Sequence, residues 1–327
     1  MSEMKKLNVQ WAINNAIAEE MRRDPNVFIV GEDVGGPGGP FGVTRGLQAE
    51  FGMDRAVDTP ISEGAIVGLC CGAAASGLRP VAEIMFMNFI TLAVEEFYNQ
   101  GSKMRWMFGG QVKQPFVVRA MTAGGFGAGP HHSSSLEGWF ASMPGMKVVM
   151  PSNAYTAKGL MKSAIRDDNP VLYVEPLSSY TIKMDVPTDE FLVPIGEAQL
   201  VNEGSDVTIV SIGRMRLEAE KAVAKLKEDG ISAELLDLCT VNPLPMEDIY
   251  NSVKKTNRLA IIHEAKEVMG IGAEIAASVQ ENLFDWLDAP VVRCAAPFTH
   301  IAFQPLLEKH YLPNADKLVA KVKGLMG

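Results

Sequence analysis

The sequence predicts an α/β protein of two domains, each built on a mostly parallel sheet. Strand-like apolar runs alternate with helix-like periodic segments along the whole chain, which is typical of this class. The length of 327 residues suits two domains of ordinary size. Hydrophobic residues make up 47% of the chain and charged residues 21%, a globular composition that excludes a largely disordered protein.

In the first half, helices and strands follow one another in order. The helices are predicted by amphipathic spacing and the strands by short apolar runs. Ser62 stands where an N-cap is expected. Two glycine-rich loops, 35–42 and 123–130, cannot hold regular structure. We expect helices over 8–22, 63–76, 99–106 and 154–166, and strands over 27–30, 80–87, 116–119, 147–150 and 171–174.

The pattern restarts after a mixed, proline-containing segment between about Tyr180 and Gly196, which we interpret as a linker. The predicted boundaries are a first domain over 1–185, a linker over 186–200 and a second domain over 201–327. In the second domain we expect strands at 207–212, 233–237, 259–262 and 291–292, and helices at 217–229, 246–254 and 272–282.

Charge, cysteines and hydropathy exclude several classes of protein. The formal net charge is −9, so no overall positive field attracts a nucleic acid. The four cysteines have no C-x-x-C spacing, which argues against a zinc ribbon or a disulfide framework. The N-terminal segment has no uninterrupted apolar run, and the most apolar stretch, 65–78, is too short to span a bilayer. We therefore expect a cytoplasmic protein with no membrane partner.

The glycines give little support to a self-contained nucleotide site. Gly270-Ile271-Gly272 opens a predicted helix but lacks a third glycine at the spacing of a dinucleotide-binding turn. Neither glycine-rich loop has that spacing, and no Walker A sequence occurs. The favoured interpretation of this pair is a helix start that lets the backbone approach a neighbour. An NAD-dependent oxidoreductase stays open as an alternative.

Two carboxylates and a pair of histidines are candidate site residues. Glu32 follows a buried strand, at the sheet edge where α/β proteins bind ligands, although a solvated loop carboxylate is equally compatible. Glu63 lies in the first turn of a helix, where the helix dipole alone favours an acid. His131 and His132 follow a flexible loop, and such loops often carry function.

Two other interpretations of these histidines have less support. Ser133–Ser135 follow directly and would suit a Ser–His hydrolase, but the sequence has no G-x-S-x-G turn and no identifiable acid to orient a histidine. Two adjacent histidines without further ligands nearby make a poor metal site. We expect His263, His300 and His310 to be structural or at the surface.

Six segments in this order resemble one known family over almost the whole chain. The family is the beta subunit of the thiamine-diphosphate-dependent decarboxylating component of 2-oxo acid dehydrogenase complexes, of the acetoin or pyruvate type. It has a transketolase-like pyrimidine-binding domain followed by a transketolase C-terminal-like domain. The matching segments are GEDV (31–34), DTPISE (58–63), GLRPVAEIMFMNF (77–89), HHSSSLEGWF (131–140), PGMKVVMPS (144–152) and KSAIRDDNPVLYVE (162–175).

The resemblance implies that Glu63 faces the aminopyrimidine ring of thiamine diphosphate. The cofactor must lose a proton from its thiazolium carbon, and a carboxylate on the pyrimidine ring nitrogen stabilises the imino form that takes this proton. A glutamine would hold no transferable proton. Met85 and Phe89 match residues around the pyrimidine; as strand residues four apart, they would share one face.

The resemblance assigns further roles to other residues. His132 matches an active-site histidine that helps bind the substrate or the lipoyl group and transfers a proton, for which a near-neutral pKa is suited; His131 could exchange roles with it. Glu32 matches a carboxylate between two distant active sites. A potassium site built from backbone carbonyls, which suit a hard cation, is implied at Phe116, Ala164, Ile165, Asp167 and Asn169.

One absence predicts a partner. The G-D-G sequence and distant Asn that usually hold the diphosphate and Mg²⁺ are missing, and the nearest string, 228–230, ends a helix. The resemblance names the partner as an alpha subunit in a two-plus-two heterotetramer that passes its acyl group to a lipoylated acyltransferase. Segments 65–76 and 85–107 are interface candidates. A non-catalytic scaffold subunit stays open as a second alternative.

Overall fold

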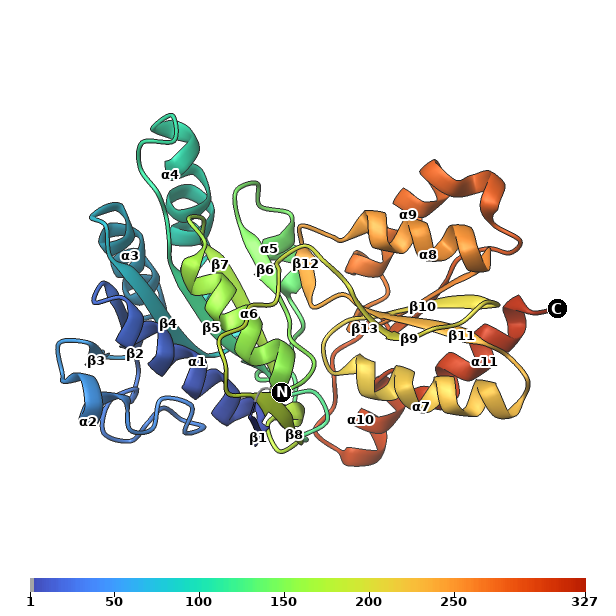
Figure 1. Cartoon of the computed structure of the whole chain (residues 1–327), viewed down its shortest axis with the longest axis horizontal. Coiled ribbons are helices and arrows are strands. Elements are labelled where there is room, and N and C mark those ends of the chain that lie inside the picture. Colours follow the sequence, from blue (N-terminus) through green and yellow to red (C-terminus); the bar gives the residue numbers. More distant parts are fainter. Residues whose placement is uncertain (1–2) are drawn as a thin grey trace. The chain divides into compact units, whose positions relative to one another are not determined.

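The computed structural model describes residues 3–327, which divide into two compact units. The first unit comprises the described residues up to Thr122 together with Trp139–Ile195, and the second comprises Ala123–Gly138 and Gly196–Gly327. The glycine-rich loop with its two histidines therefore groups with the second half of the chain. Figure 1 shows the elements of both units. Among the described residues, no helix is long and apolar enough to cross a membrane.

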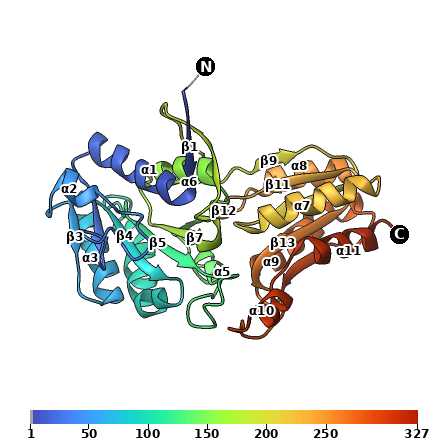
Figure 2. The ribbon, with the colours of Figure 1, turned by 90° about the horizontal axis from the view of Figure 1, so that it is seen from below.

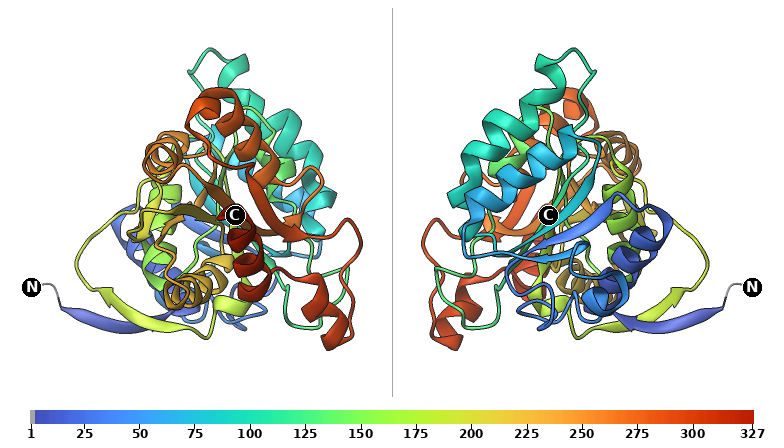
Figure 3. Two further views of the ribbon diagram at one scale, coloured as in Figure 1. Left: turned by 90° about the vertical axis from the view of Figure 1, so that its right-hand side faces the viewer. Right: turned by 90° about the vertical axis from the view of Figure 1, so that its left-hand side faces the viewer.

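The first unit contains a parallel sheet with strand order β6-β7-β5-β4-β2-β3. Figures 1 and 3 show α1 and α6 on one face of this sheet, and α3 and α4 on the other. The strands β1 and β8 form a separate antiparallel pair. The elements are β1 (Met4–Asn8), α1 (Val9–Arg23), β2 (Val27–Gly31), α2 (Leu47–Phe51), β3 (Ala56–Asp58), α3 (Glu63–Ala75), β4 (Arg79–Phe86), the 3₁₀-helix η1 (Phe89–Ala93), the π-helix η2 (Glu96–Gly101), α4 (Ser102–Met107), β5 (Val117–Thr122), α5 (Glu137–Ala141), β6 (Lys147–Val149), α6 (Ala154–Arg166), β7 (Val171–Pro176), η3 (Leu177–Ser179) and β8 (Lys183–Pro187).

Side-chain caps begin the two helices that pack together on one face. The Asn8 side chain accepts a hydrogen bond from the backbone N–H of Trp11 at the start of α1. Asn153 and Thr156 form a reciprocal capping box at the start of α6. Figure 2 shows the two helices side by side.

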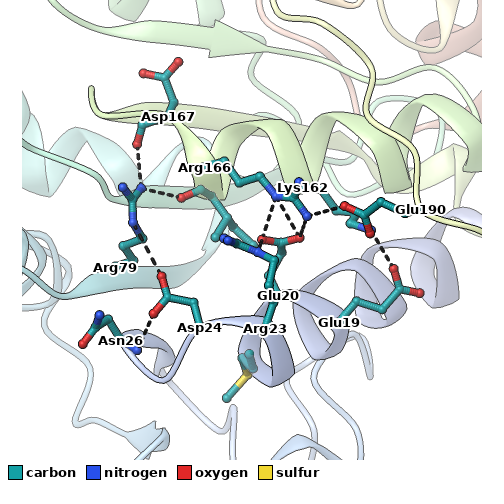
Figure 4. Close-up of polar contacts among 12 residues, drawn as sticks. Glu19, Glu20, Arg23, Asp24, Asn26, Arg79, Lys162, Arg166, Asp167 and Glu190 are labelled. Carbon is teal, nitrogen blue, oxygen red and sulfur yellow. Dashed lines mark hydrogen bonds and ion pairs between the residues drawn. The ribbon is translucent and has the colours of Figure 1, made fainter.

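Ion pairs join α1 to α6 (Figure 4). The buried Lys162 places Nζ 2.9 Å from the Glu19 carboxylate and 2.6 Å from that of Glu190. Arg166 places Nη2 2.6 Å from Glu20 and also pairs with Glu190. Glu190 lies beyond β8, so these pairs tie the end of the first unit to its helical face.

The second unit contains a sheet of order β14-β13-β10-β11-β9, in which only β9 is antiparallel to its neighbour. Helices α7 and α11 cover one face, and α8 and α9 cover the other (Figures 1 and 2). Apolar side chains from α7, α11 and the sheet form its core. The elements are β9 (Gln199–Asn202), β10 (Val207–Ser211), α7 (Met215–Glu228), β11 (Ala233–Asp237), β12 (Thr240–Asn242), α8 (Met246–Thr256), β13 (Leu259–Lys266), α9 (Ile271–Leu283), η4 (Phe284–Trp286), β14 (Val292–Ala296), α10 (Pro305–Tyr311) and α11 (Ala315–Leu325).

Within the segment interpreted as a linker, Lys183–Pro187 forms β8. The structure corrects two local expectations. Ser62 occupies the N-cap position of α3, but its side chain makes no capping hydrogen bond. Phe89 is not a strand residue: β4 ends at Phe86 and Phe89 begins η1, so strand alternation does not place it beside Met85.

All four cysteines are buried thiols. One other expectation is confirmed. Gly270 and Gly272 begin α9 where a Cβ atom at Gly272 would lie 2.5 Å from Nε2 of His263. The pair thus permits a close backbone approach, which explains these glycines without a nucleotide. His263 itself is buried, and burial lowers its pKa to about 4, while His300 and His310 are exposed.

Candidate active site

Glu32 and Glu63 come together at the carboxyl edge of the first unit's sheet. Glu32 follows β2, and Glu63 begins α3 shortly after the neighbouring β3. Because the carboxyl ends of parallel strands share one edge, the topology brings these acids close. Burial raises the pKa of Glu32, and the charges of Glu63 and Asp33 raise it further.

Glu63 lies at a largely buried position and makes no ion pair among residues 3–327. Its exposed fraction is 8%. The carboxylate oxygens themselves reach solvent and are not buried without a partner. An acid at a buried position keeps its charge at low cost only where it reaches water or a partner. The carboxylate is therefore accessible to a nitrogen-bearing group that comes from outside the chain.

Apolar side chains lie at the end of β4 and the start of η1. Met85 and Phe89 are partly exposed. Phe86 makes edge-on contacts with Phe41 and Phe89, with ring centroids 5.6 and 5.8 Å apart. These partly exposed apolar groups fit a wall for an aromatic ring.

A buried ionic network that the sequence analysis missed crosses the centre of the same sheet. Arg119 of β5 lies in register with Glu83 of β4 and pairs with its carboxylate. It also makes two parallel hydrogen bonds to Glu175 of β7, of 2.7 and 2.9 Å. The hydroxyl of Tyr180 donates to the same Glu175. Burial raises the pKa of Glu83 although Arg119 opposes this, and the nearby Glu32 adds to the increase.

His131 and His132 belong to the second unit. His131 is exposed and His132 is partly buried. Nδ1 of His132 lies 3.2 Å from the carbonyl oxygen of Ala128. A carbonyl can only accept, so this contact requires a proton on Nδ1 and leaves Nε2 as the acceptor of the neutral ring.

Buried acids that the sequence analysis did not nominate lie in the second unit. Glu137 is 1% exposed and Glu264 of β13 is 5% exposed. Glu264 pairs with Arg214, and a Cβ atom at Gly124 would overlap its other carboxylate oxygen. Burial raises the pKa of Glu137 to about 7, and the charge of Glu264 contributes to the rise.

The raised pKa of Glu137 predicts a specific pH dependence of stability. An ordinary Glu titrates near 4.5, so folding takes up a proton between about pH 4.5 and 7. The contribution of Glu137 is fully present below this window and is lost as the pH rises through 7. We expect Glu137→Gln to remove this pH dependence. Within the window, the free energy of unfolding of the wild type should then fall with rising pH more steeply than that of the variant, by up to about 1.4 kcal/mol per pH unit. Thermal unfolding of both proteins between about pH 5 and 8 measures the difference; parallel pH profiles would contradict the prediction.

Four of the five backbone carbonyls expected to hold potassium already accept hydrogen bonds within the chain. The Arg79 guanidinium lies 2.9 and 3.1 Å from the carbonyl oxygens of Ile165 and Asp167. The carbonyl of Phe116 accepts from Val171, and that of Ala164 accepts from Asp167. The side chain of Asn169 accepts from Arg105 at 2.8 Å. A potassium ion would have to share these carbonyls through their second lone pairs.

A cavity of about 900 Å³ lies elsewhere in the first unit. Its lining includes Trp106, Pro144 and Asn169, and neither Glu63 nor Met85 contributes to it. Trp106 is 88% exposed, and Met107 and Phe108 beside it are also exposed. This apolar surface is separate from the candidate site at the sheet edge.

Comparisons with known proteins identify both halves of the chain. Residues 5–183 match the transketolase pyrimidine-binding domain, and residues 196–318 match the transketolase C-terminal domain. The chain also resembles a split-gene transketolase described as an inactive beta4 tetramer, with a TM-score of 0.81 and 98% of each chain covered. At 22% identity, this structure supports the fold alone.

Two curated relatives are much closer in sequence. The chain is 46% identical to the acetoin:2,6-dichlorophenolindophenol oxidoreductase subunit beta of Bacillus subtilis (strain 168), covering 98% of this chain and 97% of the relative. It is 43% identical to the 2-oxoisovalerate dehydrogenase subunit beta of the same organism, covering 96% and 97%. Both alignments span the two domains.

Proposed function

The chain belongs to the family of beta subunits of acetoin and 2-oxo acid dehydrogenase E1 components, and on this premise we propose that it supplies half of a thiamine-diphosphate site. The observation that carries the proposal is Glu63, whose side chain is 8% exposed, makes no ion pair among the described residues and lies close to Glu32 at the sheet edge. When bound, thiamine diphosphate supplies a carbon nucleophile and an electron sink for breaking the bond beside a carbonyl. The family membership replaces the alternative of an NAD-dependent oxidoreductase.

The chain's own residues divide the work at this site. Glu63 accepts and holds a proton at the pyrimidine ring nitrogen. Met85 and Phe89 present apolar surface to the ring and exclude water around it. Glu32, whose pKa is raised by burial and by Glu63, is suited to share a proton at this edge. His132 contributes a ring nitrogen to the substrate or to the lipoyl acceptor.

A second polypeptide completes the enzyme. The alpha subunit holds the diphosphate and Mg²⁺, since this chain lacks the usual G-D-G sequence. Exposed Trp106, Met107 and Phe108 are apolar side chains suited to an interface in a two-plus-two assembly. A lipoylated acyltransferase accepts the product. A potassium ion would have to share the carbonyls of Ile165 and Asp167 with Arg79.

Cofactor binding tests the half-site directly. We expect the purified chain alone to show no measurable affinity for thiamine diphosphate with Mg²⁺, and the co-expressed alpha and beta pair to bind it at least about a hundredfold more tightly. Isothermal titration measures both. The pair is then assayed by dye reduction with acetoin, pyruvate and 2-oxoisovalerate to identify the substrate. Binding and turnover by the lone chain would rule the proposal out.

A further inference from the structure

The second unit orders the backbone of the loop that carries His131 and His132. Residues 123–138 group with that unit, and Figure 3 shows the loop beside α10. The loop contains Gly124, Gly125, Gly127 and Gly129, and it has no regular structure before α5. Such a segment has many conformations available when unfolded, so its order must come from specific contacts.

Glu308 supplies two of these contacts. Its side chain projects from α10 and is 4% exposed. Oε1 accepts a hydrogen bond from the backbone N–H of Gly125, and Oε2 accepts one from that of Gly127, both at 2.9 Å. Each carboxylate oxygen thus holds one backbone donor, and charged acceptors make stronger hydrogen bonds than neutral ones.

Other side chains of the same unit shape the loop. Glu264 fills the space beside Gly124, and the ring of Phe303 fills the space beside Gly129. A Cβ atom at either glycine would overlap these groups. The glycines therefore allow the loop to lie directly against the side chains that hold it.

The held backbone leads directly to the histidine. Gly127, which donates to Glu308, is followed by Ala128, whose carbonyl contacts Nδ1 of His132 at 3.2 Å. The N–H of Ala123 donates to the carbonyl of His132 at 3.1 Å, which closes the loop. A shift of residues 125–128 would move the carbonyl that orients the imidazole ring.

We propose that Glu308 is a positioning residue, which sets the orientation of His132 by clamping the backbone of Gly125 and Gly127. The effect on the reaction rests on the role proposed above for His132. The two hydrogen bonds from the loop backbone to Glu308 are independent of that role, because they concern only the geometry of the loop.

Glu308→Gln is the informative substitution in the alpha–beta complex. The amide keeps one acceptor but turns an NH₂ group toward a backbone N–H, so one of the two hydrogen bonds to the loop backbone is lost. We expect hydrogen exchange in peptides covering 123–132 to accelerate at least about tenfold. We also expect kcat to fall roughly ten- to a hundredfold while thiamine diphosphate affinity changes less than about twofold. Glu308→Asp, which keeps both acceptors, should recover part of each effect.

Two comparisons separate positioning from general damage to the fold. Glu281→Gln is the matched control, an exposed acid in α9 of the same unit, and should leave exchange and kcat unchanged. In a His132→Ala background, Glu308→Gln should cost little additional activity if it acts through the histidine. Exchange outside 123–132 should stay at the wild-type rate.

Unchanged loop exchange in Glu308→Gln would overturn the proposal, and so would a full additional loss of kcat on top of His132→Ala. Wild-type turnover by His132→Ala would instead disprove the role of that histidine. The exchange measurement would still decide whether Glu308 holds the loop.

Discussion

Replacing Glu63 with glutamine is expected to reduce turnover of the alpha–beta complex roughly a thousandfold, while the complex still assembles. Glutamine preserves the size of the side chain but cannot hold a transferable proton at the pyrimidine nitrogen. Glu63 makes no ion pair among the described residues, so the change breaks none within the protein. Steady-state dye reduction measures turnover, and size-exclusion chromatography measures assembly.

Glu274→Gln provides the matched control for this prediction. Glu274 also lies in the first turn of a helix, α9, but it is exposed. If Glu63 served only the helix dipole, the two substitutions would have similarly small effects. Wild-type turnover by the Glu63→Gln complex would contradict the catalytic assignment and would favour a non-catalytic scaffold.

Replacing Arg119 with methionine is expected to give the largest loss of stability in the first unit. The change leaves Glu83 and Glu175 buried without their counter-charge, a situation that costs about 3–5 kcal/mol. For a domain of this size, that corresponds to a fall in thermal midpoint of roughly 10 °C. Thermal unfolding followed by circular dichroism measures the shift.

Lys221→Met is the control for this substitution. Lys221 pairs with Glu218 on the surface of α7, and its side chain is 62% exposed. Exposed pairs contribute less than about 1 kcal/mol, because water and salt screen them. If the thermal midpoint of Arg119→Met were as close to the wild-type midpoint as that of Lys221→Met, the buried network would not stabilise the sheet.

Periodicity alone predicted much of the fold. The expected helix over 154–166 and strand over 233–237 match α6 and β11 residue for residue. Long amphipathic helices and buried apolar strands carry a strong local pattern, and this explains the agreement. The strand pair β1 and β8 was missed because its strands lie far apart in the chain and each has only one buried residue, so neither forms an apolar run. Helices α10 and α11 were not predicted either.

The site was predicted less completely than the fold. The resemblance nominated Glu63 and Glu32, and the structure places both at one edge of the sheet. A local signal for the Arg119 network existed, namely single charges inside apolar strands at Glu83, Arg119 and Glu175. Their pairing could not be deduced, because it depends on which strands are neighbours.

Glu308 had no such signal. It stands in an ordinary charged helical segment, and its partners are backbone N–H groups about 180 residues earlier in the chain. Only the tertiary structure reveals contacts of this kind, since a backbone donor leaves no trace in the identity of its residue.

The grouping of residues 123–138 with the later part of the chain limits how such genes can recombine. A crossover between two relatives near residue 195 would follow the apparent domain border, yet it would join a histidine loop from one parent to a supporting surface from the other. Glycines 124 and 129 and the bulky groups opposite them would then be inherited separately. Hybrids of this kind should retain activity only when both parents carry compatible residues at these positions.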